Sequence, residues 1–529
     1  MRSIRVLVLG AVLLTGAVAS PVQGQQTAPA APTFRVTSNL VFLDVTVLDK
    51  KGRPVVTGLT RDDFTITEDG KPQRIFSFDA PDAGAKTAGE APTTVLVLDL
   101  LNTPLKDSAY ARYSISRYLA LQPERLKSPT ELMVLNNTTF DMVQAYTHSR
   151  SDLVYALNHV PGAEPFKLEY GSPDERLSES IEALQQIALQ NKGLPGRKNI
   201  LWVGYGGPGI PIDPADPRYD KSMRFFAHGT TNMLVDARIT LFLIDPGGVQ
   251  GAQSPDYWRI NFSSPELGAT VDIPGDPFVG SINFGMLVRN TGGVFFHDRN
   301  DVDAEIGKAQ ELGSDYYTLT YQPPVGVPDG KFRNIKVTLR DPNLRAITKT
   351  GYYAPEPPTA DDPVPQTMSA MDEISEAAQS GVVFDTLGLT MVKAVRHPDS
   401  NTAEVTVLLK STHLRWQATN DGGSGANVTV AAVSLSSRRD ILASTLKKLI
   451  VLSNSQDAAR LAQSNTMLTL MVAVPRHTES VRVVIRTDDG GQVGTVELDH
   501  RSLETAPEIP TPDPQLLERP RPVTLQPQP

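Results

Sequence analysis

Cysteine is missing from all 529 residues. Its absence excludes disulfide bonds, a thiol nucleophile, thiolate metal sites and the cysteine that carries a lipid anchor. Secreted animal domains commonly rely on disulfides, so an exported protein of this size without them is more typical of bacteria.

Basic runs are lacking as well, and long apolar runs are lacking beyond the start of the chain. The formal net charge is −9, which argues against nucleic acid as a partner. The apolar stretch Val6–Ala19 follows Arg2 and Arg5 and precedes small residues up to Gly24, as in a cleaved signal peptide. Because it is shorter than the roughly 20 residues that span a bilayer, we expect an extracytoplasmic protein, periplasmic or secreted, with no membrane insertion after cleavage.

Catalytic motifs are scarce too. The eight histidines show neither H-x-x-x-H nor H-E-x-x-H spacing, and no G-x-S-x-G elbow occurs. His297 and Asp298 follow a predicted strand, but a surface loop before a helix near Asp301 is the better interpretation. Gly204–Gly209 fits G-x-G-x-x-G, yet the prolines after it cannot open the helix that a dinucleotide needs. We therefore expect no enzyme.

What the chain does have is a buried strand that ends in a carboxylate. The run from Thr94 through Val95–Leu98 is mostly aliphatic and leads straight into Asp99. Ligands bind at such carboxyl ends in doubly wound sheets. Strands alternate with helices from here to residue 312, which predicts an α/β fold with a mostly parallel sheet covered on both faces.

Composition and periodicity divide the rest of the chain. The tyrosines at 316, 317, 321, 352 and 353 are expected mainly in core and edge packing. The predicted segments are a signal peptide (1–24), a disordered leader (25–32), a small β-sandwich-like module (33–79), a linker (80–92), the α/β domain (93–312), an antiparallel β extension at the edge of its sheet (313–354), a Pro-rich linker (355–366), a β-rich C-terminal domain (367–501) and a disordered Pro-rich tail (502–529).

Several motifs in order resemble one protein family, the bacterial VWFA-related proteins abundant in acidobacteria, with a von Willebrand factor A (VWA) domain. The resemblance covers roughly residues 34–354 and leaves 367–501 outside. It implies a VWA-like doubly wound sheet and a general association with protein interaction at the cell surface or in the periplasm. The motifs are Val45–Phe64 with Glu68–Pro72, Leu98–Pro104, Thr291–Gly293, Asp315–Pro323 and Lys349–Ala354.

The resemblance also implies where a metal would bind. VWA domains hold a divalent cation with a D-x-S-x-S loop, a threonine before the long helix and an aspartate after the fourth strand. Here Asp99 and Thr103 match two of these ligands, and Leu101 replaces a hydroxyl. The other positions are also poorly matched: Asn102 is one step off and expected to point elsewhere, Gly171-Ser172 is the nearest stand-in for the threonine, and Val203–Gly207 has no carboxylate.

We therefore expect a degenerate metal site with at most weak Mg²⁺ binding and no other cofactor. In this interpretation Asp99 braces the loop through hydrogen bonds and Thr103 helps to start the next helix.

Three hypotheses about function follow. The leading one is an exported adhesion or scaffold protein that binds another protein through the loops 206–219 and 247–280, largely without metal. The second is cation-dependent adhesion through Asp99 and Thr103. The third is an extracytoplasmic hydrolase with its site near His297 or in the C-terminal domain.

Overall fold

The structure, a computed structural model, describes most of the chain from residue 40 to residue 505. The predicted signal peptide and leader, most of both linkers and nearly all of the tail lie outside the described residues. None of the helices it describes is long and apolar enough to cross a membrane. The described residues are 40–81, 91–136, 139–160, 172–211, 215, 218, 223–249, 276–278, 281–324, 328–355, 368–419, 423–453, 457 and 465–505.

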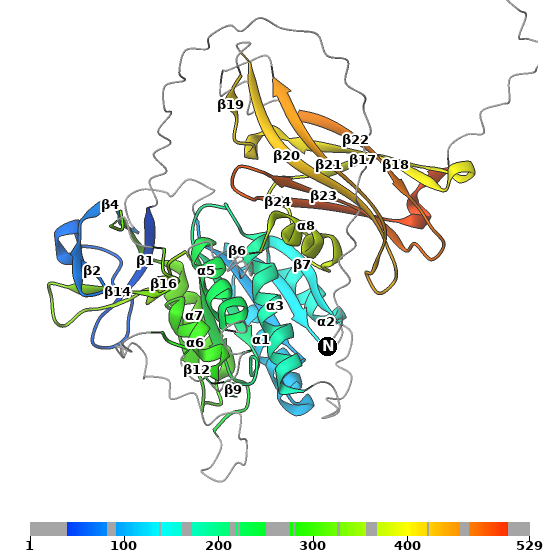
Figure 1. Ribbon diagram of the computed structural model, residues 1–529. Helices are drawn as coiled ribbons and strands as arrows, with labels where there is room; N and C mark the ends of the chain where they lie inside the picture. Colours follow the sequence, from blue (N-terminus) through cyan, green and yellow to red (C-terminus); the bar gives the residue numbers. More distant parts are fainter. Residues whose placement is uncertain are drawn as a thin grey trace, which may run out of the picture. The chain divides into compact units, whose positions relative to one another are not determined.

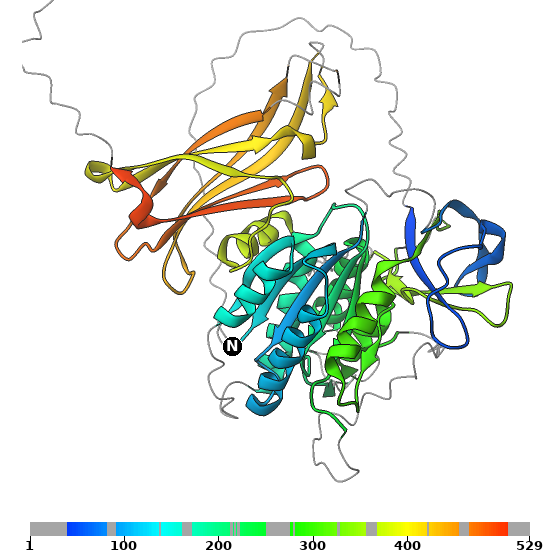
Figure 2. The ribbon, with the colours of Figure 1, turned by 180° about the vertical axis from the view of Figure 1, so that it is seen from behind.

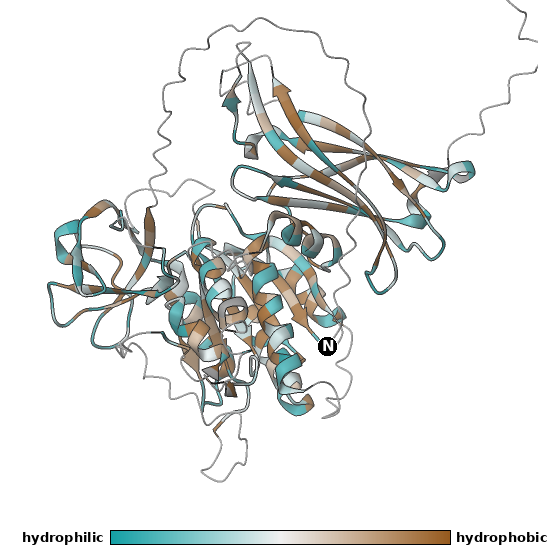
Figure 3. Ribbon diagram, viewed as in Figure 1, coloured by the Kyte–Doolittle hydropathy of each residue, from teal (hydrophilic) through white to brown (hydrophobic). Residues whose placement is uncertain are grey.

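The α/β region is built on a six-stranded sheet in the order β12-β10-β8-β5-β6-β7 (Figure 1). The pairs from β12 to β6 are parallel, and β7 is antiparallel to β6. Helices cover both faces, so the central strands are apolar along their length, as the brown strands of Figure 3 show. The strands are β5 (Thr93–Asp99), β6 (Arg125–Leu135), β7 (Phe140–Ser149), β8 (Lys198–Val203), β10 (Ile239–Ile244) and β12 (Phe295–Phe296), with a separate pair β9 (Ile210–Pro211) and β11 (Ser281–Ile282).

The two faces of this sheet have separate cores (Figure 2). Val95 and Val97 of β5 pack with α3, α5 and α6, whereas Leu96 and Leu98 pack with α1, α2 and α7, as the period of two along a strand requires. The helices are α1 (Leu105–Ala120), α2 (Arg150–His159), α3 (Pro173–Gln190), α5 (Thr230–Asp236), α6 (Phe284–Asn290) and α7 (Val302–Ser314), and the π-helix η2 (Met223–Gly229) runs into α5.

Residues 41–79 and 317–353 form one β unit, which corrects two expected boundaries. The segment 33–79 was expected to stand alone, and 313–354 was expected at the edge of the α/β sheet. Instead their strands alternate in two four-stranded sheets, β15-β1-β13-β4 and β16-β14-β2-β3. The strands are β1 (Val41–Leu48), β2 (Phe64–Glu68), β3 (Lys71–Gln73), β4 (Ile75–Asp79), β13 (Tyr317–Tyr321), β14 (Phe332–Leu339), β15 (Arg345–Ile347) and β16 (Gly351–Tyr353).

The reason is that neither segment buries its apolar face alone. Leu43 and Val45 of β1 share a core with Tyr317, Leu319 and Tyr321 of β13. The expected packing role of the tyrosines is confirmed at positions 316, 317, 321 and 353, which are at most 2% exposed, while Tyr352 is half-buried.

The C-terminal region is β-rich, with one helix in front of it. One sheet has the order β22-β18-β17-β25 and the other β19-β20-β23-β24, with β21 paired to β20. Because β25 pairs with β17, residues 504–505 belong to this region and not to the expected tail. The elements are α8 (Ala370–Gln379), β17 (Thr390–His397), β18 (Thr402–Lys410), β19 (Gln417–Ala418), β20 (Ser424–Leu435), β21 (Ile441–Ser453), β22 (Asn465–Ala473), β23 (Ser480–Thr487), β24 (Val493–Asp499) and β25 (Glu504–Thr505).

Candidate functional site

Asp99 ends β5 at the carboxyl edge of the six-stranded sheet, where the sequence placed it. Its neighbours in the sheet are β6 and β8, so the loops after three adjacent strands meet around it. The side chain is completely buried. A functional carboxylate at this edge has to be judged by what its two oxygens contact.

Both oxygens of Asp99 are occupied by N–H donors. Oδ1 accepts from the backbone N–H groups of Leu101 at 3.1 Å and Asn102 at 2.9 Å. Oδ2 accepts from the Trp202 indole at 3.0 Å and the Gly206 backbone at 3.0 Å. The Asn102 side-chain amide lies 3.3 Å and 3.2 Å from the two oxygens. Since a carboxylate offers about four lone-pair sites, these donors fill them.

Asn102 therefore points toward Asp99, which corrects the expectation that it points elsewhere. Its amide also donates to the Ser180 hydroxyl of α3 at 2.9 Å. Burial raises the pKa of Asp99 above its ordinary value, while the donors from Asn102, Trp202 and Gly206 act against that rise. The negative charge that a cation would balance is met by N–H groups.

Thr103 is equally committed. Its side-chain oxygen accepts from the backbone N–H of Tyr205 at 3.1 Å, and α1 has no side-chain cap at its first residue. Thr103 thus ties two loops together and does not start the helix as expected. Ser172, the expected stand-in for a ligand threonine, caps α3 in a capping box with Glu175, so its hydroxyl serves the helix.

The loop after β8 closes over the same point. Gly204 has a φ of +152°, and a Cβ there would lie 2.4 Å from the Asp99 Cβ and 2.7 Å from the Thr103 hydroxyl. A carboxylate at this position would require the loop to move. The residues at Asp99 and Thr103 do not fit a divalent cation, because their oxygens are used and the space above them is filled by backbone.

His297 and Asp298 form a pair on the surface. The imidazole Nδ1 lies 2.6 Å from a carboxylate oxygen of Asp298, and α7 begins shortly afterwards at Val302 behind Asp301. Within the described residues His297 has no further hydrogen bond, although its ring packs 4.8 Å from that of Phe295. Nothing in the geometry adds a nucleophile to the pair.

A second histidine–carboxylate contact was not foreseen from the sequence. His228 in η2 lies 2.9 Å from Asp276 through Nε2, and its ring stacks on Tyr353 at 3.8 Å. The Tyr353 hydroxyl donates to the other Asp276 oxygen at 2.8 Å. Burial would raise the pKa of Asp276, but the bonds from His228, the backbone N–H of Phe278 and Tyr353 lower it overall.

This cluster is a brace and not a reactive centre. The second ring nitrogen of His228, Nδ1, is buried and has no hydrogen-bond partner within the described residues, so no substrate reaches it. A signal for the cluster was present in the sequence only at Tyr353, which lies in the Lys349–Ala354 motif.

The glycines of the Thr291–Gly293 motif serve packing in the same way. A Cβ at Gly293 would lie 1.7 Å from the Leu241 carbonyl oxygen, and one at Gly292 would lie 2.4 Å from the backbone of Thr348. Thr291 accepts from the Leu241 N–H at 3.1 Å. These motif residues hold the turn against β10, and none of them builds a site.

Glu131 lies in a buried polar network between β6, β7 and α3. Its side chain accepts from Gln190 at 2.9 Å, and Tyr146 beside it donates to Asn191 at 3.0 Å. Burial raises the pKa of Glu131 to about 8, and the hydrogen bonds from Gln190 and Tyr146 only partly oppose it. The group is neutral over much of the ordinary pH range, which matters for stability.

One surface cluster has the residue types of a metal site. Glu479, Asp499 and His500 in the C-terminal region offer ligand atoms within 4.8 Å of one another. Asp499 also accepts from the Arg501 backbone N–H at 2.7 Å, and His500 Nδ1 lies 3.0 Å from the Glu479 carbonyl. These contacts account for the cluster as a turn after β24.

Comparison with known proteins assigns no family. No protein-family model matches the chain, and no curated protein matches it. Among solved structures, proximal thread matrix protein 1 from the mussel byssus is similar at 7% identity over 42% of this chain and 48% of that one, with a TM-score of 0.25. Human COPII-coat protein Sec24c is similar at 9% identity over 51% of this chain and 44% of that one, with a TM-score of 0.24.

A third solved structure is the manganese-loaded TRAP protein of Plasmodium vivax, at 10% identity over 56% of this chain and 100% of that one, with a TM-score of 0.24. The matched parts span about half of the thread matrix protein and less than half of Sec24c. Scores of this size do not establish a shared fold and carry no argument for function.

Proposed function

We propose that the chain is an exported protein-interaction module, used in adhesion or as an envelope scaffold, whose VWA-like α/β domain works without a bound cation. The observation that carries the cation-free part is the filled carboxylate of Asp99, with N–H donors on both oxygens. The VWA-like assignment is supported by the motifs and by the position of Asp99 at the carboxyl edge of a mixed α/β sheet.

The interaction role is supported by apolar side chains at that edge. Leu105, the first residue of α1, is 49% exposed, and Val249, which follows the turn after β10, is 64% exposed. Both lie on loops or loop ends next to the carboxyl edge, where binding residues on α/β sheets gather. Exposed apolar residues of this kind suit a protein partner more than a polar small molecule.

A pull-down from the cell envelope of the source organism tests the partner. The purified chain should capture a protein, and the changes Leu105→Asp and Val249→Asp should each reduce capture at least tenfold, since a buried charge opposes an apolar contact. Leu121→Asp is the matched control, because Leu121 is 76% exposed at the other end of α1. Equal capture by all variants would remove the carboxyl edge from the interface.

Calorimetric titration with Mg²⁺ and Mn²⁺ tests the cation-free part. We expect no isotherm assigned to Asp99 at millimolar ion, and capture of the partner should be unchanged by EDTA. A clear isotherm that Asp99→Asn abolishes, together with EDTA-sensitive capture, would instead support cation-dependent adhesion.

A further inference from the structure

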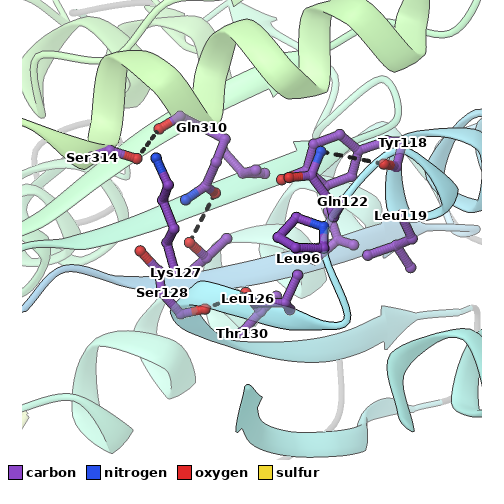
Figure 4. A pocket seen from close by; sticks show the side chains of 13 residues that line it. Leu96, Tyr118, Leu119, Gln122, Leu126, Lys127, Ser128, Thr130, Gln310 and Ser314 are labelled. Atoms are coloured by element: carbon purple, nitrogen blue, oxygen red, sulfur yellow. Dashed lines mark hydrogen bonds between the residues drawn. The ribbon is translucent and has the colours of Figure 1, made fainter. Parts of the chain in front are cut away.

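A pocket of about 90 Å³ opens at the amino edge of the α/β sheet, opposite the edge that holds Asp99 (Figure 4). Its walls come from the start of β5, the start of β6 and the middle of β8, and from the last turns of α1 and α7. All of its lining residues belong to the described part of the chain. The pocket plays no part in the function proposed above.

The floor of the pocket is aliphatic. Leu96 of β5 and Leu201 of β8 come from the sheet, Leu119 comes from α1, and Leu126 comes from β6. These four side chains are at most 8% exposed. A ligand in the pocket therefore needs a short apolar part to fill this floor.

The rim supplies hydrogen-bond donors and one positive charge. Thr94 donates its hydroxyl to the Gln310 carbonyl oxygen at 2.9 Å, which leaves the Gln310 NH₂ group to donate into the opening. Lys127 is exposed and forms no ion pair within the described residues. In Figure 4 its side chain runs toward Gln310 and Ser314.

The lining contains no aspartate or glutamate. The positive charge of Lys127 and the amide of Gln310 thus face an opening with no protein anion to satisfy them. Ammonium and amide donors together bind a carboxylate well, because charge-assisted hydrogen bonds are roughly twice as strong as neutral ones. The volume corresponds to about three water molecules, so only a small molecule fits.

We propose that this pocket binds a short aliphatic monocarboxylate, with its carboxylate on Lys127 and Gln310 and its alkyl part on the leucine floor. The chemistry distinguishes this ligand from the corresponding amide, which lacks the charge, and from the corresponding amine, which Lys127 repels. For a ligand of so few atoms the dissociation constant should lie between about 0.1 and 10 mM.

Titration of the purified full chain with butyrate, followed by calorimetry or ligand-observed NMR, tests the proposal. Butyrate should bind saturably, butyramide at least tenfold more weakly, and butylamine not at all. Lys127→Met should weaken butyrate at least tenfold, the loss expected for one hydrogen bond to a charged group. Lys71→Met, a change at an exposed lysine of β3, is the matched control and should bind as the unchanged chain does.

A second variant tests the apolar floor separately from the charge. Leu126→Phe adds volume at the mouth of the pocket and should abolish binding while the melting temperature stays close to that of the unchanged chain. Absence of saturation up to on the order of 50 mM butyrate, or equal binding by the unchanged chain and Lys127→Met, would overturn the proposal. Neither result would affect the proposed interaction role, which concerns the other edge of the sheet.

Discussion

At the scale of single residues, the chain uses buried polar groups to hold loops in place. Asp99 gathers the loops after β5 and β8 through N–H donors, and Asp276 gathers η2 and β16 through His228 and Tyr353. A buried acceptor with all its donors present stabilises a unique arrangement, whereas a missing donor costs about 1–3 kcal/mol. Such groups are therefore the sensitive points of the fold.

Trp202→Phe tests the role of Asp99. It removes an indole donor from a buried carboxylate and leaves a small cavity, so the free energy of unfolding should fall by about 2–4 kcal/mol in urea titrations. The matched control is Trp416→Phe, because the Trp416 indole lies 3.4 Å from the Ser411 carbonyl and has no charged acceptor. A loss no larger than in the control would argue against the brace.

Glu131 gives a prediction about pH. Its folded pKa of about 8 lies above the ordinary value of 4.5, so the unfolded chain releases this proton first. The stabilising contribution is complete below pH 4.5, declines as pH rises, and is lost above about 8. Between pH 5 and 8 the unchanged chain should lose about 4 kcal/mol relative to Glu131→Gln, at about 1.4 kcal/mol per pH unit.

Urea titrations at both pH values measure this difference. Glu311→Gln serves as control, since Glu311 is an exposed residue of α7 paired with Lys308. A Glu131→Gln variant that follows the pH dependence of the unchanged chain would contradict the assignment.

At the scale of elements, local pattern was enough where one segment decides its own structure. The helix expected at 174–190 is observed as Pro173–Gln190, and the strand ending at Asp99 is observed as Thr93–Asp99, because apolar periodicity and capping residues lie within each segment. Partners distant in sequence were not predictable. The turn of Asn102 toward Asp99 depends on the fit of the whole loop, and the pairing of β1 with β13 depends on residues more than 250 positions apart.

Two glycines of the α/β region give opposite predictions. Gly293→Ala should prevent stable folding or lower the free energy of unfolding by more than about 4 kcal/mol, because its Cβ would lie 1.7 Å from the Leu241 carbonyl oxygen. Gly307→Ala should raise stability by about 0.5–1 kcal/mol, because Gly307 lies inside α7 with nothing within 4 Å of an added Cβ. Thermal unfolding of the two variants measures both effects.

At the scale of the whole molecule, the β unit and the α/β domain are interleaved along the chain. Strands β1–β4 precede the α/β domain and β13–β16 follow it, yet they share two sheets. Contacts also join the two parts directly: the Thr46 hydroxyl donates to the Leu312 carbonyl at 2.9 Å, and Arg238 binds Asp44. The α/β domain is therefore an insertion within the β unit.

Fragments test this arrangement. A fragment of residues 34–354 should fold cooperatively and stay soluble. One of residues 93–354 should aggregate and bind a hydrophobic dye, since it leaves the buried faces of β13 and β14 without partners. The fragment 93–314, which removes those strands as well, should be more soluble than 93–354. Equal solubility of 93–354 and 34–354 would contradict the shared core.

The strand pairing of the β unit has a mechanical consequence. Asp79, at the end of β4, pairs with Thr318, near the start of β13, so the chain enters and leaves the inserted domain at neighbouring positions. Tension applied at residues 40 and 354 first loads the hydrogen bonds that join β1 and β4 to β13. The inserted domain stays outside the force path until those sheets rupture, so its carboxyl edge keeps its shape while the chain is under load.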